Sequence, residues 1–142
     1  MEQGRADQAC RYRIFGYRLA MPFSLPDFEQ CIDPEPNLQA DVVAIIDTLP
    51  AQSLDTQWTL NNIEFGIVAG VFELKHPALG RVIVRQGSEI IFEPGAEKFS
   101  RLVRTFLSNT LMPVIALQRG QIPLHSSIVD IDGTIAAFIG VS

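Results

Sequence analysis

One stretch of the chain, residues 95–120, has the apolar spacing of an amphipathic helix, whereas the segments around it have strand patterns. Apolar side chains recur there at i, i+3, i+4 and i+7, and this stripe comprises Phe99, Leu102, Val103, Phe106, Leu107, Leu111, Val114 and Ile115. Pro113 removes one backbone donor, so we expect a kink or a split near residues 109–112. Gly120 is a predicted C-cap. One long helix among many strands predicts an α+β fold.

The residues before the helix predict an antiparallel β-rich N-terminal domain, residues 1–94. Four prolines in residues 22–37 indicate an extended loop. Two β-rich runs that meet at Gln86-Gly87-Ser88 predict a hairpin over residues 81–94. The other predicted strands cover residues 10–21 with a bulge at Gly16, residues 40–47, and two parts of residues 58–76 that separate near Asn61-Asn62 or Gly66. Residues 95–120 are then a helix that bridges to a second unit, residues 121–142.

Composition narrows the classes of protein to consider. A chain of 142 residues with 47% hydrophobic content can build one ordinary core, or one small domain and part of another. The net charge of -5 disfavours non-specific binding to nucleic acid or to an anionic membrane. The chain has no apolar stretch of about 18 residues, and its first ten residues have no apolar core, so we expect neither a membrane span nor a signal peptide. We therefore expect a cytoplasmic protein in which Cys10 and Cys31 are free thiols.

The last residues predict a hairpin whose register follows from its turn. Asp132-Gly133 is a strong signal for a two-residue type I′ turn, because that turn needs positive φ at both central residues. With this turn, Ile131 lies opposite Thr134, and each further pair lies one residue farther from the turn on both strands. His125 then lies opposite Gly140, at the end of the hairpin away from the turn.

The second strand of this hairpin, "IAAFI" (residues 135–139), is apolar on both faces, which is typical of a strand covered by helices on both sides. A strand that ends in glycine is the usual setting for a phosphate-binding loop of the form G-x-x-x-x-G-K-[ST]. Gly140, Val141 and Ser142 would be the opening residues of such a loop. The same three residues also fit a plain strand exit.

The stretch "LQRGQIPLHSSIVDIDGTIAAFIGVS" resembles the segment that leads into the phosphate loop of HPr kinase/phosphorylase-like P-loop serine kinases. In that family a helix ends in glycine and is followed by Leu-His-small residue, a hairpin through Asp/Gly, an apolar strand and G-x-S-G-x-G-K-S. The residues that match are Gly120, Pro123, Leu124, His125, Ser126, Gly133, Gly140 and Ser142. The N-terminal "YRIFGYRLAMPFSLPDF" also resembles the opening of members that carry a small β-rich domain before the kinase.

The resemblance implies a parent protein that is an ATP-dependent serine kinase, binds ATP and Mg²⁺, and phosphorylates a serine on a small protein or peptide. Gly140, Val141 and Ser142 would begin its nucleotide-binding loop. His125 would lie near the transferring phosphate or the acceptor, or else cap the strand end through a backbone hydrogen bond.

The chain departs from the family pattern after Ser142. The second glycine, the loop lysine, the loop Ser/Thr and the metal-binding acidic residues are missing, and these groups position and neutralise the phosphates. We therefore expect residues 121–142 to be the first hairpin of a truncated P-loop kinase domain. The fragment itself should be inactive and bind no cofactor. Its apolar strand 135–139 should be largely uncovered and promote self-association.

Other residues have simpler interpretations. Asp132 fits the turn and Asp130 a solvated strand face, although paired carboxylates can also bind a metal. His76 precedes Pro77 and is expected on the surface, and no zinc-type spacing of His and Cys occurs. The alternative to a kinase is a non-catalytic β-rich module that binds a protein or peptide, for example by strand addition at an open sheet edge.

Overall fold

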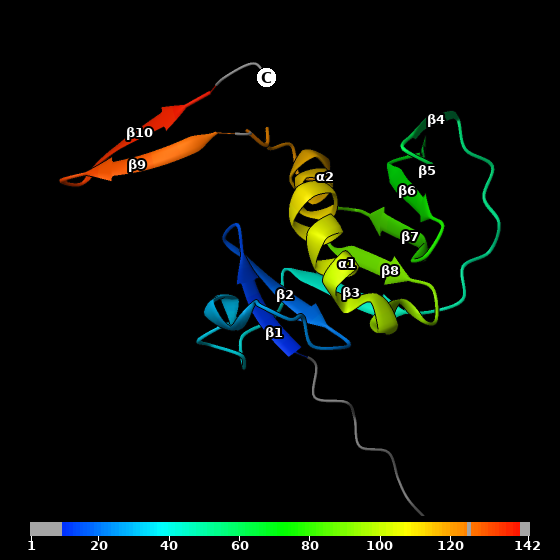
Figure 1. Ribbon diagram of the computed structural model, residues 1–142, viewed down its shortest axis with the longest axis horizontal. Coiled ribbons are helices and arrows are strands. Elements are labelled where there is room, and N and C mark those ends of the chain that lie inside the picture. The colour runs from blue at the N-terminus through cyan, green and yellow to red at the C-terminus, as the bar shows by residue number, and fades with distance from the viewer. Residues whose placement is uncertain (1–9, 125, 140–142) are drawn as a thin grey trace, which may run out of the picture.

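The computed structural model describes residues 10–124 and 126–139. Within these residues the protein is mixed α/β, with an eight-stranded sheet, one helical segment on its face and a separate two-stranded hairpin (Figure 1). The large sheet has the strand order β1-β2-β3-β8-β7-β6-β5-β4. Its strands are β1 (Cys10–Ile14), β2 (Tyr17–Met21), β3 (Val42–Ile46), β4 (Thr56–Leu60), β5 (Ile63–Val68), β6 (Val71–His76), β7 (Gly80–Arg85) and β8 (Glu89–Phe92).

The sheet is mostly antiparallel, as predicted, but β3 is parallel to both of its neighbours. The loop after β2, which contains one 3₁₀ turn (Glu29–Cys31), carries the chain back so that β3 starts at the same end as β2. Strands β4 to β8 form an antiparallel meander, and its last strand, β8, pairs with β3. The apolar sequence of β3 suits this interior place in the sheet.

Two of the predicted strand segments contain turns that the sequence patterns did not reveal. Residues 10–21 form two strands, because Phe15 and Gly16 adopt φ of 50° and 83° and reverse the chain. Residues 58–76 contain the expected turn at Asn61-Asn62 and a second turn at Ala69-Gly70. The hairpin predicted for residues 81–94 is confirmed as β7 and β8.

The helical segment, Ala96–Gln118, consists of a 3₁₀ turn η2 (Ala96–Phe99), α1 (Ser100–Phe106), a π-helical turn η3 (Leu107–Leu111) and α2 (Met112–Gln118). The disturbance expected near residues 109–112 thus takes the form of a π-helical turn. The Met112 N–H donates to the Leu107 carbonyl, five residues back, and Pro113 follows without a donor of its own. Gly120 closes the segment as predicted, with φ of 74° and the Gln121 N–H bonded to the Ala116 carbonyl.

The core lies between the helical segment and one face of the sheet. The helix buries one stripe, Val103, Leu107, Leu111, Met112 and Ile115. The sheet contributes alternate residues from its central strands, Leu19, Met21, Val42, Leu74, Val82, Val84, Ile90 and Phe92. Each such side chain stabilises the fold by about 1.5–3 kcal/mol relative to an exposed position.

The turn between β7 and β8 is fastened to the end of the helix. The Gly87 N–H donates to Gln118 Oε1 at 2.7 Å, and Arg119 Nε donates to the Gly87 carbonyl. Gly87 has φ of 61°, and a Cβ at this position would approach the Arg119 side chain to 2.7 Å. The turn therefore requires glycine both for its backbone conformation and for this close approach.

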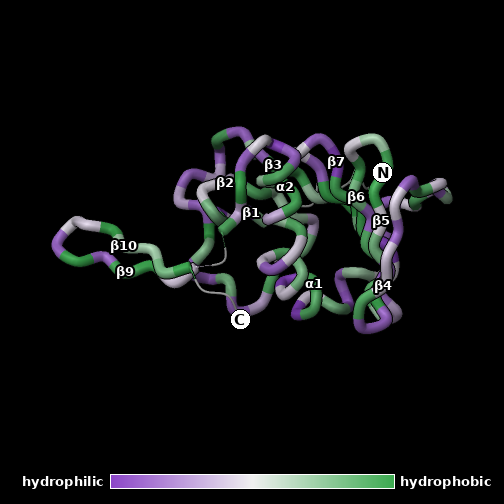
Figure 2. The backbone as a smooth tube through the Cα atoms, turned by 90° about the horizontal axis from the view of Figure 1, so that it is seen from above, coloured by the Kyte–Doolittle hydropathy of each residue, from purple (hydrophilic) through white to green (hydrophobic). Residues whose placement is uncertain are grey.

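The hairpin β9 (Ser127–Ile131) and β10 (Thr134–Phe138) projects away from the sheet and the helix (Figures 1 and 2). None of its residues belongs to the core cluster. No helix in the described residues is both long and apolar enough to cross a membrane.

We expect Ile115→Ala to lower the free energy of unfolding by about 2–5 kcal/mol, because it leaves a cavity where the helix meets the sheet. Leu117→Ala is the matched control on the same helix, since Leu117 is 57% exposed. Its effect should stay within about 0.5 kcal/mol. Urea denaturation of both variants measures the difference, and equal losses would show that the helix does not bury this stripe.

Candidate functional site

The residues predicted for the kinase site, His125, Gly140, Val141 and Ser142, lie outside the described residues. Their roles stay predictions. The structure does describe the segments that lead to them, residues 121–124 on one side and the end of β10 on the other.

The predicted register of the β9–β10 hairpin is confirmed at every pair of its ladder. Ile131 lies opposite Thr134, and Ser127 lies opposite Phe138. Asp132 has φ of 51° in the turn, as a type I′ turn requires. Asp130 Oδ1 accepts a hydrogen bond from the Gly133 N–H at 2.9 Å, so this carboxylate braces the turn.

Apolar side chains are exposed on both faces of the hairpin. Ile135 is 70% exposed, and its neighbours in the hairpin Ile128, Val129, Ile131, Phe138 and Ile139 are exposed as well. Figure 2 shows this apolar character along much of a hairpin that no other element covers. An isolated two-stranded hairpin is marginally stable in water. The hairpin therefore has the composition of an element that another layer of structure would cover.

A groove of about 840 Å³ lies beside the helical segment, between the β1–β2 turn and the segment that follows the helix. We call it the helix–linker groove. Its described lining comes from the β1–β2 hairpin, from one side of the helix around the π-helical turn, and from residues 121–124 and 126: Phe15, Tyr17, Ser108, Asn109, Met112, Pro113, Ala116, Gln121, Ile122, Pro123, Leu124 and Ser126. Two of its lining residues, Leu124 and Ser126, are the neighbours of His125 in the sequence.

Tyr17 ties the two sides of this groove together. Its hydroxyl donates to Gln121 Oε1, and the guanidinium of Arg119 lies 5.0 Å from the centre of its ring. Arg119 Nη2 also donates to the Asp41 carbonyl at 2.7 Å. These contacts hold the start of the linker, the segment that follows the helix from residue 121, against the sheet.

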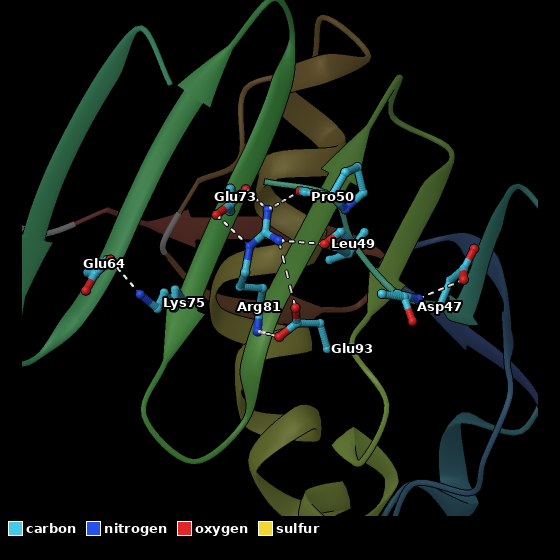
Figure 3. A network of polar contacts seen from close by, with 9 residues as sticks. Asp47, Leu49, Pro50, Glu64, Glu73, Lys75, Arg81 and Glu93 are labelled. Atoms are coloured by element: carbon cyan, nitrogen blue, oxygen red, sulfur yellow. Dashed lines mark hydrogen bonds and ion pairs between the residues drawn. The ribbon is translucent and has the colours of Figure 1, made fainter. Parts of the chain in front are cut away.

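In the described part of the chain, the ionic clusters hold loops onto the sheet and do not converge on a cavity. On the face opposite the helix, Arg81 pairs with Glu73 and Glu93 and donates to the carbonyls of Leu49 and Pro50 at 3.0 and 2.9 Å (Figure 3). Glu73 is only 8% exposed, and its carboxylate accepts two hydrogen bonds from the Arg81 guanidinium. This cluster fixes the chain between β3 and β4 over the sheet.

A second cluster holds the loop between β2 and β3. Arg18 Nη1 donates to Asp33 at 3.0 Å, and Arg18 Nη2 pairs with Glu35 at 2.6 Å. The backbone N–H of Glu35 donates to Asp33 Oδ1 at 3.0 Å. This backbone bond, with Arg18 beside it, lowers the pKa of Asp33 below its usual 3.8.

The remaining candidates have structural roles. His76, predicted on the surface, is half-buried: its Nδ1 accepts from the N–H groups of Ala78 and Leu79, and its ring contacts Phe106 edge to face. Cys10 and Cys31 are free thiols in the structure. No group of three or more His, Cys, Asp or Glu side chains among the described residues could hold a metal ion.

Sequence reasoning did not find the helix–linker groove, because its lining joins segments that lie far apart in the chain. Two features of the groove do have a signal in the sequence. Pro113 within a helical pattern marks the π-helical turn, and Phe15-Gly16 marks a chain reversal that brings Phe15 and Tyr17 toward the helix.

We expect Asp33→Asn to change the pH dependence of stability. Because the folded state lowers the pKa of Asp33, its ionised form stabilises the protein above the unfolded value, and this contribution disappears as the pH falls below about 4. The melting temperature of Asp33→Asn should therefore lie below that of wild type at pH 7, and the gap should narrow at acid pH. Asp132→Asn, at a turn that accepts Asn, is the control and should follow wild type. A difference in melting temperature between Asp33→Asn and wild type that stays constant with pH would contradict the lowered pKa of Asp33.

Comparison of the chain with protein-family models, with curated proteins and with solved structures found no match in any of the three.

Proposed function

We propose that this chain is part of an ATP-dependent serine kinase related to HPr kinase/phosphorylase. The observation that carries the proposal is the β9–β10 hairpin, which has the register deduced from Asp132-Gly133 and exposes apolar side chains on both faces. A strand of this kind suits the interior of a layered α/β domain, where helices cover both faces of the sheet. The strand also leads directly to Gly140, the first residue of the proposed phosphate loop.

In this proposal the two ends of the hairpin have different tasks. The turn at Asp132-Gly133 is held by its own backbone and Asp130, and takes no part in phosphate transfer. The proposal extends the ladder beyond the described pair of Ser127 and Phe138, so that residues 125 and 140 would lie opposite each other at this open end. The phosphate loop would begin at this edge, with ATP and Mg²⁺ bound by residues after Ser142 and a serine of a small protein or peptide as acceptor. The kinase would act in the cytoplasm.

The proposal is tested by reading the coding sequence beyond codon 142. We expect it to continue with Gly-x-Gly-Lys-Ser and the longer product to bind ATP with micromolar affinity when Mg²⁺ is present. Replacing the loop lysine by alanine should lower that affinity at least about tenfold, because the lysine neutralises the phosphates. Isothermal titration calorimetry measures both, and the 142-residue chain serves as the control that binds no ATP. A continuation without the lysine would refute the kinase.

A binding module is the second candidate, and the edge strand β4 favours it. β4 is the last strand of the sheet, and all of its residues are exposed. Its sequence "TQWTL" has no charged residue and no proline, although natural edge strands usually carry such protection. The other edge, β1, is partly covered, because Tyr12 bridges to Ile32 and the Asp33 N–H donates to the Arg11 carbonyl. β4 is therefore the edge that is open to strand addition.

Trp58 reports on this second candidate, because it is the single tryptophan of the chain and stacks on Phe65 with ring centres 5.4 Å apart. If β4 accepts an added strand, a capped Thr-Val-Thr-Val-Thr peptide should shift the Trp58 emission to the blue with saturation. The substitution Gln57→Lys together with Thr59→Lys should abolish the shift, since charges protect sheet edges. The absence of any saturable shift would exclude strand addition of such a peptide at β4.

A further inference from the structure

The loop between β6 and β7 is organised around one imidazole ring. His76 ends β6 and lies opposite Gly80, the first residue of β7, so three residues form the loop. The first of them, Pro77, has no N–H. The N–H groups of the other two, Ala78 and Leu79, both donate to His76 Nδ1, at 3.1 and 3.3 Å. Every backbone donor of this loop therefore depends on one ring nitrogen.

These two hydrogen bonds determine which form of the His76 ring the loop accepts. A ring nitrogen that accepts a hydrogen bond carries no proton, so the ring is the neutral tautomer with its proton on Nε2. Protonation of Nδ1 would set a third N–H against the two that already point at it, and both loop donors would lose their acceptor. The imidazolium form of His76 is therefore incompatible with this conformation of the loop.

The same ring joins the loop to the helix. It contacts the ring of Phe106, the last residue of α1, edge to face with ring centres 5.4 Å apart. Leu79 is 3% exposed within the core cluster, and Phe106 packs against that cluster. The π-helical turn begins at the next residue, Leu107. A ring that turned away from the loop would therefore disturb the contact between sheet and helix where the helix is irregular.

No acidic side chain of the described residues is placed to compensate a positive charge on His76, which takes part in none of their ion pairs. The charged side chains of β5, β6, β7 and α1, together with the carboxylate beside Gly80, are Glu64, Glu73, Lys75, Arg81, Arg85, Glu93, Arg101 and Arg104. Each carboxylate of this set is already paired with Lys75 or Arg81 (Figure 3). The surroundings thus offer the ring cations and occupied carboxylates.

We propose that His76 acts as an acid-sensitive latch between the β6–β7 loop and the end of α1. The neutral ring holds the loop closed and packs it against Phe106, and protonation of the ring breaks both contacts. Imidazoles take up a proton between about pH 8 and 5, so the latch is closed at neutral pH and opens as the pH falls. Opening exposes Leu79 and loosens the helix against the sheet. The latch belongs to the large sheet and does not depend on the proposed kinase.

The variant His76→Asn separates the latch from ordinary packing, because Asn Oδ1 can accept the same two N–H bonds but does not titrate. It lacks the ring that contacts Phe106, so it should melt below wild type at about pH 7.5. Between about pH 7.5 and 5.5, the melting temperature of wild type should fall at least about 3 °C more than that of the variant. Circular dichroism of the 142-residue chain measures both. The effect of Asp33 belongs below about pH 4 and is absent from this range.

Two control variants identify the group that titrates and the bonds that it holds. His125→Asn removes the other histidine of the chain and should keep the wild-type dependence on pH. His76→Phe keeps a ring beside Phe106 but has no acceptor. Hydrogen exchange followed by NMR should therefore show protection of the Ala78 and Leu79 amides at least about tenfold lower than in wild type at about pH 7.5. Acid should lower this protection in wild type and leave it unchanged in His76→Phe.

A measurement on the wild-type chain tests the same point even where a variant does not fold. Long-range ¹H–¹⁵N correlation spectra distinguish the two ring nitrogens of His76, and at about pH 7.5 the proton should be on Nε2. The proposal is overturned if Nδ1 carries the proton at that pH, if wild type and His76→Asn lose equal melting temperature on acidification, or if His125→Asn abolishes the difference between them.

Discussion

The packing of one helical stripe against one face of the sheet is the interaction on which the rest of the structure depends. Val103, Leu107 and Ile115 are completely buried there, and the sheet side contributes residues from β2, β3 and β6 to β8. Apolar burial is non-directional, so polar contacts must fix where the helix lies. Gln118 and Arg119 do so through their bonds to the β7–β8 turn, and the position of the helix in turn sets one wall of the groove.

The π-helical turn lets this stripe continue past a proline. An α-helix with Pro113 in its interior would set the proline ring against the carbonyl of Asn109. The wider turn at Leu107–Leu111 accommodates the ring while Leu107, Leu111 and Ile115 stay buried on the same side. The core is thus preserved, and Ser108, Asn109 and Pro113 from this irregular part of the helix line the neighbouring groove.

The sequence predicts best where a local signal is unambiguous. Asp132-Gly133 suffices for the register of the β9–β10 hairpin, because both residues tolerate positive φ. The turn at Ala69-Gly70 was missed because alanine rarely adopts the φ of 43° that it has there, so the sheet pairing imposes that conformation. The parallel pairing of β3 and the helix–linker groove depend on which distant segments meet, and neither periodicity nor turn chemistry carries that information.

The parallel placement of β3 sets an order for folding during synthesis. β3 forms only two residue pairs with β2, which is synthesised before it. Its other partner, β8, is synthesised only after β4 to β7. The hairpins of that meander form from neighbouring segments and need little loop closure, whereas docking β8 on β3 closes a long loop. The nascent chain therefore exposes the apolar edge of β3 until β8 arrives, and this docking step is where we expect folding to be slow and chaperones to act.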